Sequence, residues 1–465
     1  MSRQRIPQIA CIFVSKFDVT HGNHLLWNYS TESISLKGLE FKSMPSGSHS
    51  CDRDVIYFVQ NDDTYGLMPG IAVYRQIYEI DDQGSLDRAT VKMFSLGLVC
   101  KPETDSLATK VWVFIKDLER LVDRLVASTK SVGTPSFDHI SSYLESNMLS
   151  YDLSYRHPIS RCVDFIRHYK ELIFPIWKCV MLHRRVLLVN SCGLDCETFS
   201  DFTYILHLLS TVTKDISSSL QRPDISSNLL YSVGLSELDW LKSDSTEVQG
   251  YIATTTDEII IDKRDAYDVA VISRPTGVTI MLSDFGNPKN QKITYSARDA
   301  RRFSLLIESL EVNVQTPRAC TSYISNVPRN LSNLITSNVY GFLWWASAGE
   351  QSNLEGQADS DGLPLLSEVE DIENFESDSD PWEIIFVGYF HQMIRRLFHT
   401  SSYLLRNQQF QSNEEGIITI EPPDLLEMGL DPLSSQDREF AVMFIQLRFG
   451  RQAVVNHFLP NLYCC

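Results

Sequence analysis

Two hydrophobic patterns follow one another in the first third of the chain. Short apolar runs bounded by Gly, Asn and Pro come first and are typical of β-strands. A helical pattern then begins, in which Ile115, Leu118, Val122 and Leu125 recur every three or four residues and charged side chains fill the opposite face. The strands expected here cover residues 9–17, 36–41, 55–59, 65–67, 71–74 and 92–100. This order predicts an antiparallel sheet followed by long helices.

Strand-like and helix-like segments alternate in the middle of the chain. The run 186–189 reads Val-Leu-Leu-Val, a continuous apolar stretch that suits a central strand covered on both faces. Thr255 with Glu258, and Ser296 with Asp299, have the spacing of helix capping boxes. Further strands are expected at 229–233, 249–254, 267–272 and 278–282, and a helix at 199–212. The alternation predicts an α/β domain, and helical patterns return at 382–405 and 440–447.

An acidic segment interrupts this order. Residues 330–394 hold 12 Asp and Glu and no Lys or Arg, so they carry −12 of the net charge of −18. We expect residues 347–380 to be a solvated, disordered tract. The apolar run 340–346 ahead of it is interpreted as packed on the protein, the alternative being a segment that touches a membrane.

Two serines of this acidic tract are phosphorylation candidates. Ser377 is followed by Asp378 and, three residues on, by Asp380, a context that acid-directed kinases favour, and Ser379 lies between them. Phosphate groups would add to a charge that is already negative. The alternative is an unmodified, solvated tail.

The loop 45–50, Pro-Ser-Gly-Ser-His-Ser, is the first place to look for chemistry. It lacks the G-x-x-x-x-G-K-[ST] pattern of a phosphate-binding loop and the flanking glycines of a nucleophile elbow. Ser48 and His49 are adjacent, and adjacent residues of an extended segment point to opposite faces, so they do not pair easily as nucleophile and base. We interpret the loop as a shaped structural or binding turn, and the sequence offers no catalytic residue.

The ten cysteines are scattered, and none of them form a C-x-x-C pair. We therefore expect reduced core thiols in a cytoplasmic protein, with no metal and no other cofactor. Cys464 and Cys465 resemble a double-cysteine prenylation ending, although the apolar residues before them favour a packed C-terminus. No stretch approaches the 18 apolar residues of a membrane span, and no basic face suggests nucleic-acid binding.

Three segments resemble one known family. Residues 36–49 (LKGLEFKSMPSGSH) with 54–58, residues 174–191 and residues 251–271 are similar to the LCHN branch of DENN-domain proteins, as is the C-terminal end. The chain thus resembles a fungal-type LCHN/Avl-like homologue, and the acidic insert shows no match. The resemblance implies an α/β fold in which a longin-like N-terminal lobe, an antiparallel sheet plus helices, packs on a DENN α/β core with C-terminal helices. The expected domains are the longin-like lobe (1–135), the DENN α/β core (150–315), the acidic, largely disordered insert (316–380) and the helical C-terminal part of the DENN module (381–465).

The resemblance also implies a function. Many DENN-domain proteins are guanine-nucleotide exchange factors for Rab GTPases, so we expect such an activity in membrane trafficking. An exchange factor makes no covalent bond and acts by stabilising the nucleotide-free GTPase, which agrees with the lack of a catalytic motif. The alternative is a non-catalytic adaptor of the same fold that binds a GTPase or a trafficking partner. We expect a cytoplasmic protein that is recruited to endomembranes and does not bind nucleic acid.

The exchange surface of this family lies between the two lobes. The expected GTPase contacts are therefore Lys42, His49, Asp52 and Arg53, the alternative being that their loop only braces the lobes. A basic span over residues 155–190 is a second candidate, for an anionic membrane or an acidic GTPase surface; the alternative is ordinary charges on helix faces. The residues expected to form this basic surface are Arg156, Arg161, Arg167 and Lys170.

Overall fold

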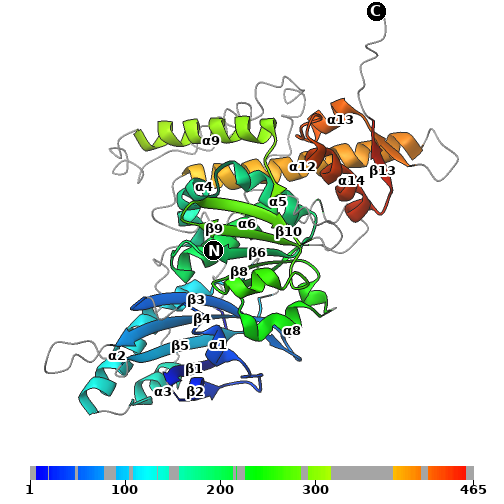
Figure 1. The fold of residues 1–465 in the computed structure, drawn as a ribbon. Coiled ribbons are helices and arrows are strands. Elements are labelled where there is room, and N and C mark those ends of the chain that lie inside the picture. Colours follow the sequence, from blue (N-terminus) through cyan, green and yellow to red (C-terminus); the bar gives the residue numbers. More distant parts are fainter. Residues whose placement is uncertain are drawn as a thin grey trace, which may run out of the picture. The chain divides into compact units, whose positions relative to one another are not determined.

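The computed structural model describes residues 7–18, 20–47, 51–77, 91–103, 108–132, 135–145, 157–212, 216, 226–243, 245–283, 292–315, 381–409 and 417–456 (Figure 1). The chain divides into two compact units. The first takes residues 1–165, 183–208 and 227–292, and the second takes residues 166–182, 209–226 and 293–465. The predictions for His49, Arg156, Ser377, Ser379, the tract 347–380, the run 340–346 and the two terminal cysteines lie outside the described residues.

The first sheet of the first unit is antiparallel throughout, with the strand order β2-β1-β5-β4-β3. Its strands are β1 (Ile9–Asp18), β2 (Gly22–Ser30), β3 (Arg53–Asp62), β4 (Gly66–Ile77) and β5 (Lys92–Cys100). Asp18 shapes the first turn, since its Oδ1 accepts hydrogen bonds from the backbone N–H groups of Thr20 and His21 at 2.9 and 3.1 Å. The predicted antiparallel lobe is confirmed.

The predicted strand over residues 36–41 is wrong, because the chain forms the short helix α1 (Leu39–Lys42) there. Gly38, just before this helix, has a φ of 84°, a left-handed conformation that turns the chain away from an extended path. Leu39 is buried, whereas Phe41 is 47% exposed. The apolar residues of this segment therefore do not share one face of a strand.

Helix α2 (Ile115–Val132) packs on β4 and β5 of this sheet (Figure 1). Leu118, Val122 and Leu125 are fully buried, which confirms the apolar face that their spacing predicts. The helix follows η3 (Val111–Phe114) and precedes α3 (Asp138–Glu145). One face of the sheet is thus covered by an amphipathic helix.

The second sheet has the strand order β11-β10-β9-β6-β8-β7. Strands β7, β8, β6 and β9 are parallel, and β10 runs antiparallel to β9. Its strands are β6 (Val186–Asn190), β7 (Asn228–Ser232), β8 (Tyr251–Thr255), β9 (Val269–Arg274), β10 (Gly277–Leu282) and β11 (Lys292–Ile293). Every residue of β6 is buried, so the continuous apolar run at 186–189 is the central strand that the sequence predicts.

Several helical elements precede or separate the strands of this sheet in the sequence. They are η4 (Pro158–Arg161), α4 (Cys162–Tyr169), α6 (Cys196–Ser210), η6 (Leu235–Glu237), α8 (Leu238–Leu241), η7 (Thr246–Val248) and η8 (Glu258–Asp262). Thr255 does not cap an α-helix as its spacing suggested. Its Oγ1 accepts a hydrogen bond from the backbone N–H of Asp257, and the 3₁₀-helix η8 follows.

The second unit is mainly helical. Its elements are η5 (Lys170–Leu172), α5 (Ile173–Met181), α9 (Ala297–Gln315), α12 (Pro381–Gln409), β12 (Ile418–Ile420), α13 (Pro422–Glu427), α14 (Ser435–Phe449) and β13 (Ala453–Val455). Ser296 and Asp299 form the predicted capping box, with backbone-to-side-chain hydrogen bonds of 3.2 Å in both directions. The parallel pair β12–β13 was not predicted. None of the helices in the described part of the chain combines the length and the hydropathy that crossing a bilayer requires.

Candidate functional site

The two sheets of the first unit meet where β3 lies against β7. We call this junction the seam; it comprises residues 39–47 and 51–62 on the antiparallel side and residues 195–204, 228–243 and 245–262 on the parallel side. The rings of Tyr57 in β3 and Tyr231 in β7 lie 5.3 Å apart at its centre. The predicted packing of an antiparallel lobe on an α/β core is therefore present within this unit.

Asp54 joins the two sides of the seam through a helix terminus. Its carboxylate accepts hydrogen bonds from the backbone N–H groups of Cys196 and Glu197 at the start of α6, at 2.9 and 3.4 Å. A carboxylate is stabilised there, because the free N–H groups and the helix dipole both favour negative charge. Burial acts in the opposite direction and raises the pKa of Asp54.

The two cysteines beside Asp54 are poor nucleophiles. Burial raises the pKa of Cys51 to about 11, and it raises the pKa of Cys196 well above the ordinary thiol value. Both therefore remain protonated near neutral pH, and a thiol reacts far more slowly than a thiolate. In the described residues, no group of three or more His, Cys, Asp or Glu could hold a metal ion.

The loop after α1 also touches the parallel side. The Thr256 hydroxyl donates a hydrogen bond of 2.5 Å to the backbone carbonyl of Ser46. Gly47 follows with a φ of 88°, a conformation that suits glycine. This geometry supports a bracing role for the loop, one of the two interpretations that the sequence left open.

Lys42 lies inside the seam, with only 8% of its side chain exposed. Its Nζ donates a hydrogen bond of 2.6 Å to the carbonyl of Val59 in β3 and lies 3.9 Å from Oε1 of Glu237 in η6. The ring centroid of Trp240 in α8 is 6.0 Å from the same nitrogen. Burial lowers the pKa of Lys42, and the charge of Glu237 opposes that shift. Lys42 therefore connects α1 to both sides of the seam.

Three large apolar side chains remain exposed around these contacts. Phe41 is 47% exposed, Leu235 is 42% exposed and Ile259 is 59% exposed. The segments that carry them are linked. Lys42, next to Phe41, lies 3.9 Å from Glu237, which is two residues after Leu235. The backbone N–H of Leu235 donates a 3.2 Å hydrogen bond to Asp257, which is two residues before Ile259. We call Phe41, Leu235 and Ile259 the apolar triad. Exposed apolar residues on segments that are linked in this way suit an interaction surface.

The predicted contact residues differ in their exposure. Asp52 and Arg53 are exposed at the start of β3, and the carbonyl of Asp52 accepts a 2.8 Å hydrogen bond from the backbone N–H of Gln76. Lys42 is buried, so it offers little surface to a partner. A role for Asp52 and Arg53 in GTPase binding stays a prediction.

The predicted basic surface contains one residue whose charge is compensated within the protein. Arg161 is 18% exposed, and its guanidinium lies 2.9 Å from Asp201 and 3.8 Å from Glu197. Arg167 and Lys170 are exposed. Binding of a membrane or an acidic partner by these two residues stays a prediction.

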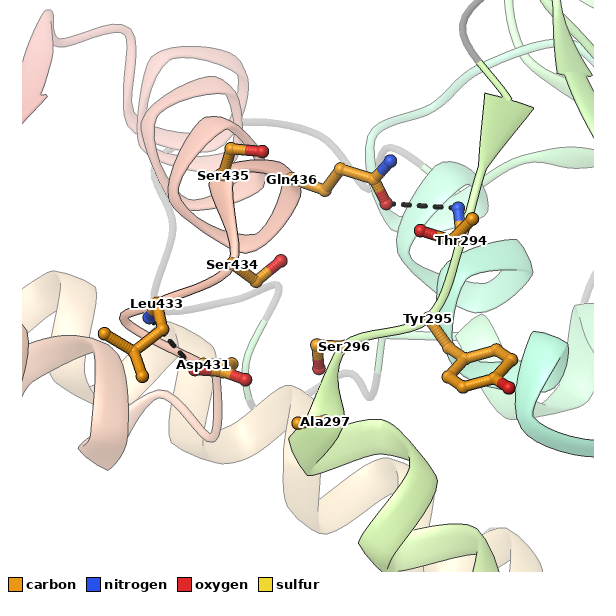
Figure 2. Close-up of a pocket in the computed structure, with 9 residues that line it drawn as sticks. All are labelled: Thr294, Tyr295, Ser296, Ala297, Asp431, Leu433, Ser434, Ser435 and Gln436. Atoms are coloured by element: carbon orange, nitrogen blue, oxygen red, sulfur yellow. Dashed lines mark hydrogen bonds between the residues drawn. The ribbon is translucent and has the colours of Figure 1, made fainter.

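The second unit contains a polar pocket of about 400 Å³ (Figure 2). It is lined by Thr294, Tyr295, Ser296, Ala297, Asp431, Leu433, Ser434, Ser435 and Gln436. The N-termini of α9 and α14 border it, but Ser296 caps the first and Ser434 caps the second. Asp299 and Asp437 lie in the first turns of these helices and already supply negative charge, so the pocket is poorly suited to an anion.

The comparisons with known proteins identify the family. The family of DENN domain-containing protein 11 matches residues 12–279, more than half of the chain. The chain belongs to this family. A domain of unknown function matches residues 336–414 and 399–465. The seam therefore lies within a DENN domain, and the predicted resemblance to DENN-domain proteins is confirmed at that level.

Individual relatives agree with this family. The uncharacterized protein ANR2 of Saccharomyces cerevisiae is 25% identical over 98% of this chain and 94% of its own length. DENN domain-containing protein 11 of Xenopus laevis is 27% identical, and that of Danio rerio is 25% identical, each over 57% of this chain. The match spans 59% and 53% of those two proteins.

Several residues of the seam escaped the sequence analysis. Glu237, Leu235 and Ile259 come from segments without a recognisable motif, and Phe41 was assigned to a strand. One signal was available for Ile259: it opens a run of three isoleucines between acidic residues, and Ile260 alone of the three is fully buried. A run of apolar residues in a short 3₁₀-helix must expose some of them.

Proposed function

We propose that this protein is a guanine-nucleotide exchange factor for a Rab-type small GTPase in membrane trafficking. In this proposal the GTPase binds over the apolar triad, and the nucleotide-free GTPase is held more tightly than the loaded one. The observation that carries the proposal is the exposed triad, Phe41, Leu235 and Ile259, at the seam of a DENN domain. The resemblance of residues 36–49 to the LCHN branch supports placing the protein in that branch.

The energetics are compatible with this role. A thousandfold faster release of GDP requires about 4 kcal/mol of extra stabilisation in the transition state. Since about half of each side chain of the triad is exposed, covering all three contributes roughly 2–4 kcal/mol. Part of this free energy can be reserved for the nucleotide-free state if the partner's switch segments rearrange to cover the triad. No covalent chemistry is needed.

The test is the release of a fluorescent GDP analogue from a panel of Rab proteins. The wild-type protein should accelerate release from one Rab or a few, and Ile259→Asp or Phe41→Asp should reduce kcat/KM by at least tenfold, because a charge would be desolvated in the complex. Tyr29→Asp is the matched control, since Tyr29 is 40% exposed in β2 of the same lobe. Its activity should stay near the wild-type value.

A non-catalytic adaptor is the second candidate, because an exposed apolar surface supports binding whether or not exchange follows. Stable, triad-dependent binding of a Rab without faster GDP release would favour the adaptor. We further propose that exposed Arg167 and Lys170 contribute to recruitment at anionic endomembranes. Charge reversal at both positions should weaken sedimentation with anionic vesicles and leave exchange in solution unchanged.

A further inference from the structure

Lys42 poses a physical question, because its charge is buried and incompletely compensated. The Nζ makes one direct hydrogen bond, to Val59, and Glu237 lies at 3.9 Å, beyond hydrogen-bond distance. A buried ion pair is often no more stabilising than well-packed apolar residues. The presence of a charged pair in such a place is better explained by the position that it imposes on its two segments than by its contribution to stability.

Glu237 transmits that position to the apolar triad. Its Oε2 accepts a 2.8 Å hydrogen bond from the backbone N–H of Gly234, and its Oε1 accepts one of 2.8 Å from the Ser236 hydroxyl. These bonds fix the turn that carries Leu235. The backbone N–H of Leu235 is in turn held by Asp257, two residues before Ile259. A continuous set of contacts therefore leads from Lys42 to two members of the triad.

The remaining member of the triad is connected through the chain itself. Phe41 precedes Lys42 in α1, and this helix has four residues and begins at Gly38 without a side-chain cap. Its buried Leu39 packs against the antiparallel sheet, and the Lys42 bond to Val59 is a further attachment, to β3. The spacing of Phe41 from Leu235 across the seam therefore depends in part on where Lys42 and Glu237 hold their two segments.

We infer that Lys42 and Glu237 are positioning residues that set the spacing of Phe41, Leu235 and Ile259 for the GTPase, without touching it themselves. This inference rests on the proposed function. With Lys42 8% exposed and Glu237 8% exposed, neither side chain has room for a partner. Losing the pair lowers the fraction of molecules that present the triad in its binding geometry, and the apparent Kd increases by the same factor.

The experiment measures GDP release as a function of GTPase concentration. Lys42→Met and Glu237→Gln should each raise the half-saturating GTPase concentration about tenfold, while the rate at saturating GTPase stays within about twofold of wild type. Lys42→Arg keeps the cation and should restore most of the affinity. Lys101→Met is the control, because Lys101 pairs with Glu32 at 2.6 Å in the same lobe, and its values should match wild type.

Each other outcome refutes the inference in its own way. If Lys42→Met and Glu237→Gln both match wild type, or if they lower the saturating rate at an unchanged half-saturating concentration, the pair does not position the surface. If Lys42→Met fails to fold, Glu237→Gln alone decides between these results, since it preserves side-chain volume. If the wild-type protein neither binds nor activates any Rab, the proposed function itself is refuted, and the inference is refuted with it.

Discussion

Lys178 is a buried ammonium at which three helices of the second unit converge. It extends from α5, and its Nζ lies 2.7 Å from Asp299 in α9 and 2.7 Å from Asp437 in α14. Both carboxylates have further donors, Ser296 N for the first and Asp431 N for the second. At 2.7 Å and an effective dielectric constant of about 20, each attraction is about 6 kcal/mol before desolvation is subtracted.

We predict that Lys178→Met destabilises the second unit by about 3–5 kcal/mol. The substitution removes the cation and leaves two carboxylates buried close together without compensation. Hydrogen exchange in the full-length protein, followed by mass spectrometry, is the assay, because the two units need not unfold together. The amides of α14 should exchange roughly a hundred- to a few thousandfold faster, since each 1.4 kcal/mol is a factor of ten.

Two further variants test the reasoning behind this prediction. Lys170→Met is the control, because Lys170 is exposed in the same unit. Its loss should leave the hydrogen-exchange rates of the α14 amides unchanged. The triple variant Lys178→Met, Asp299→Asn, Asp437→Asn should recover most of the lost stability, since none of the three charges of this cluster then remains. If Lys178→Met exchanges like the control, the ion pairs do not hold these helices together and the electrostatic argument is refuted.

The remaining predictions concern stability in both units. Because burial raises the pKa of Asp54, its contribution to stability should increase as pH falls towards the ordinary carboxyl pKa of about 4, and urea unfolding of Asp54→Asn should lose this pH dependence. Asp54→Ala should lower the free energy of unfolding by about 0.5–2 kcal/mol, because the hydrogen bonds from Asp54 to the start of α6 are lost. An unchanged urea midpoint would contradict this. Gly97→Ala should lower the free energy of unfolding by about 1–3 kcal/mol, because its Cβ would lie 2.5 Å from the Phe13 ring. At Gly388 in α12, an added Cβ meets no atom within 4 Å, so Gly388→Ala should instead raise the free energy of unfolding by about 0.5–1 kcal/mol. If Gly97→Ala and Gly388→Ala change the stability in the same direction, the packing argument is refuted.

The elements that the sequence predicted well are those whose burial follows a single regular rule. The strand at 186–189 is covered on both faces, so every residue is apolar, and the face of α2 repeats with the helical period. The strand predicted for residues 36–41 was wrong because Gly38, with its positive φ, redirects the chain into a short helix. Strand β2 was missed because it is an edge strand with no fully buried residue, so its pattern stays mixed.

The candidate site was harder to predict because its meaning depends on distant partners. Arg161 appears in the sequence as part of a basic span, yet its carboxylate partner Asp201 lies 40 residues away. Lys178 belongs to the same span, and its partners lie 121 and 259 residues away. A local count of charges therefore overestimates the free charge of this region, since the compensating groups become neighbours only in the folded chain.

The separation of Lys178 from Asp437 also has a consequence for how the protein is made. At a synthesis rate of about 5–20 residues per second, the 259 residues between them take roughly 13–50 seconds to appear. During that interval α5 has left the ribosome, but α14, which provides its last counter-charge, does not yet exist. The ion-pair centre of the second unit can therefore be completed only after α14 has been synthesised.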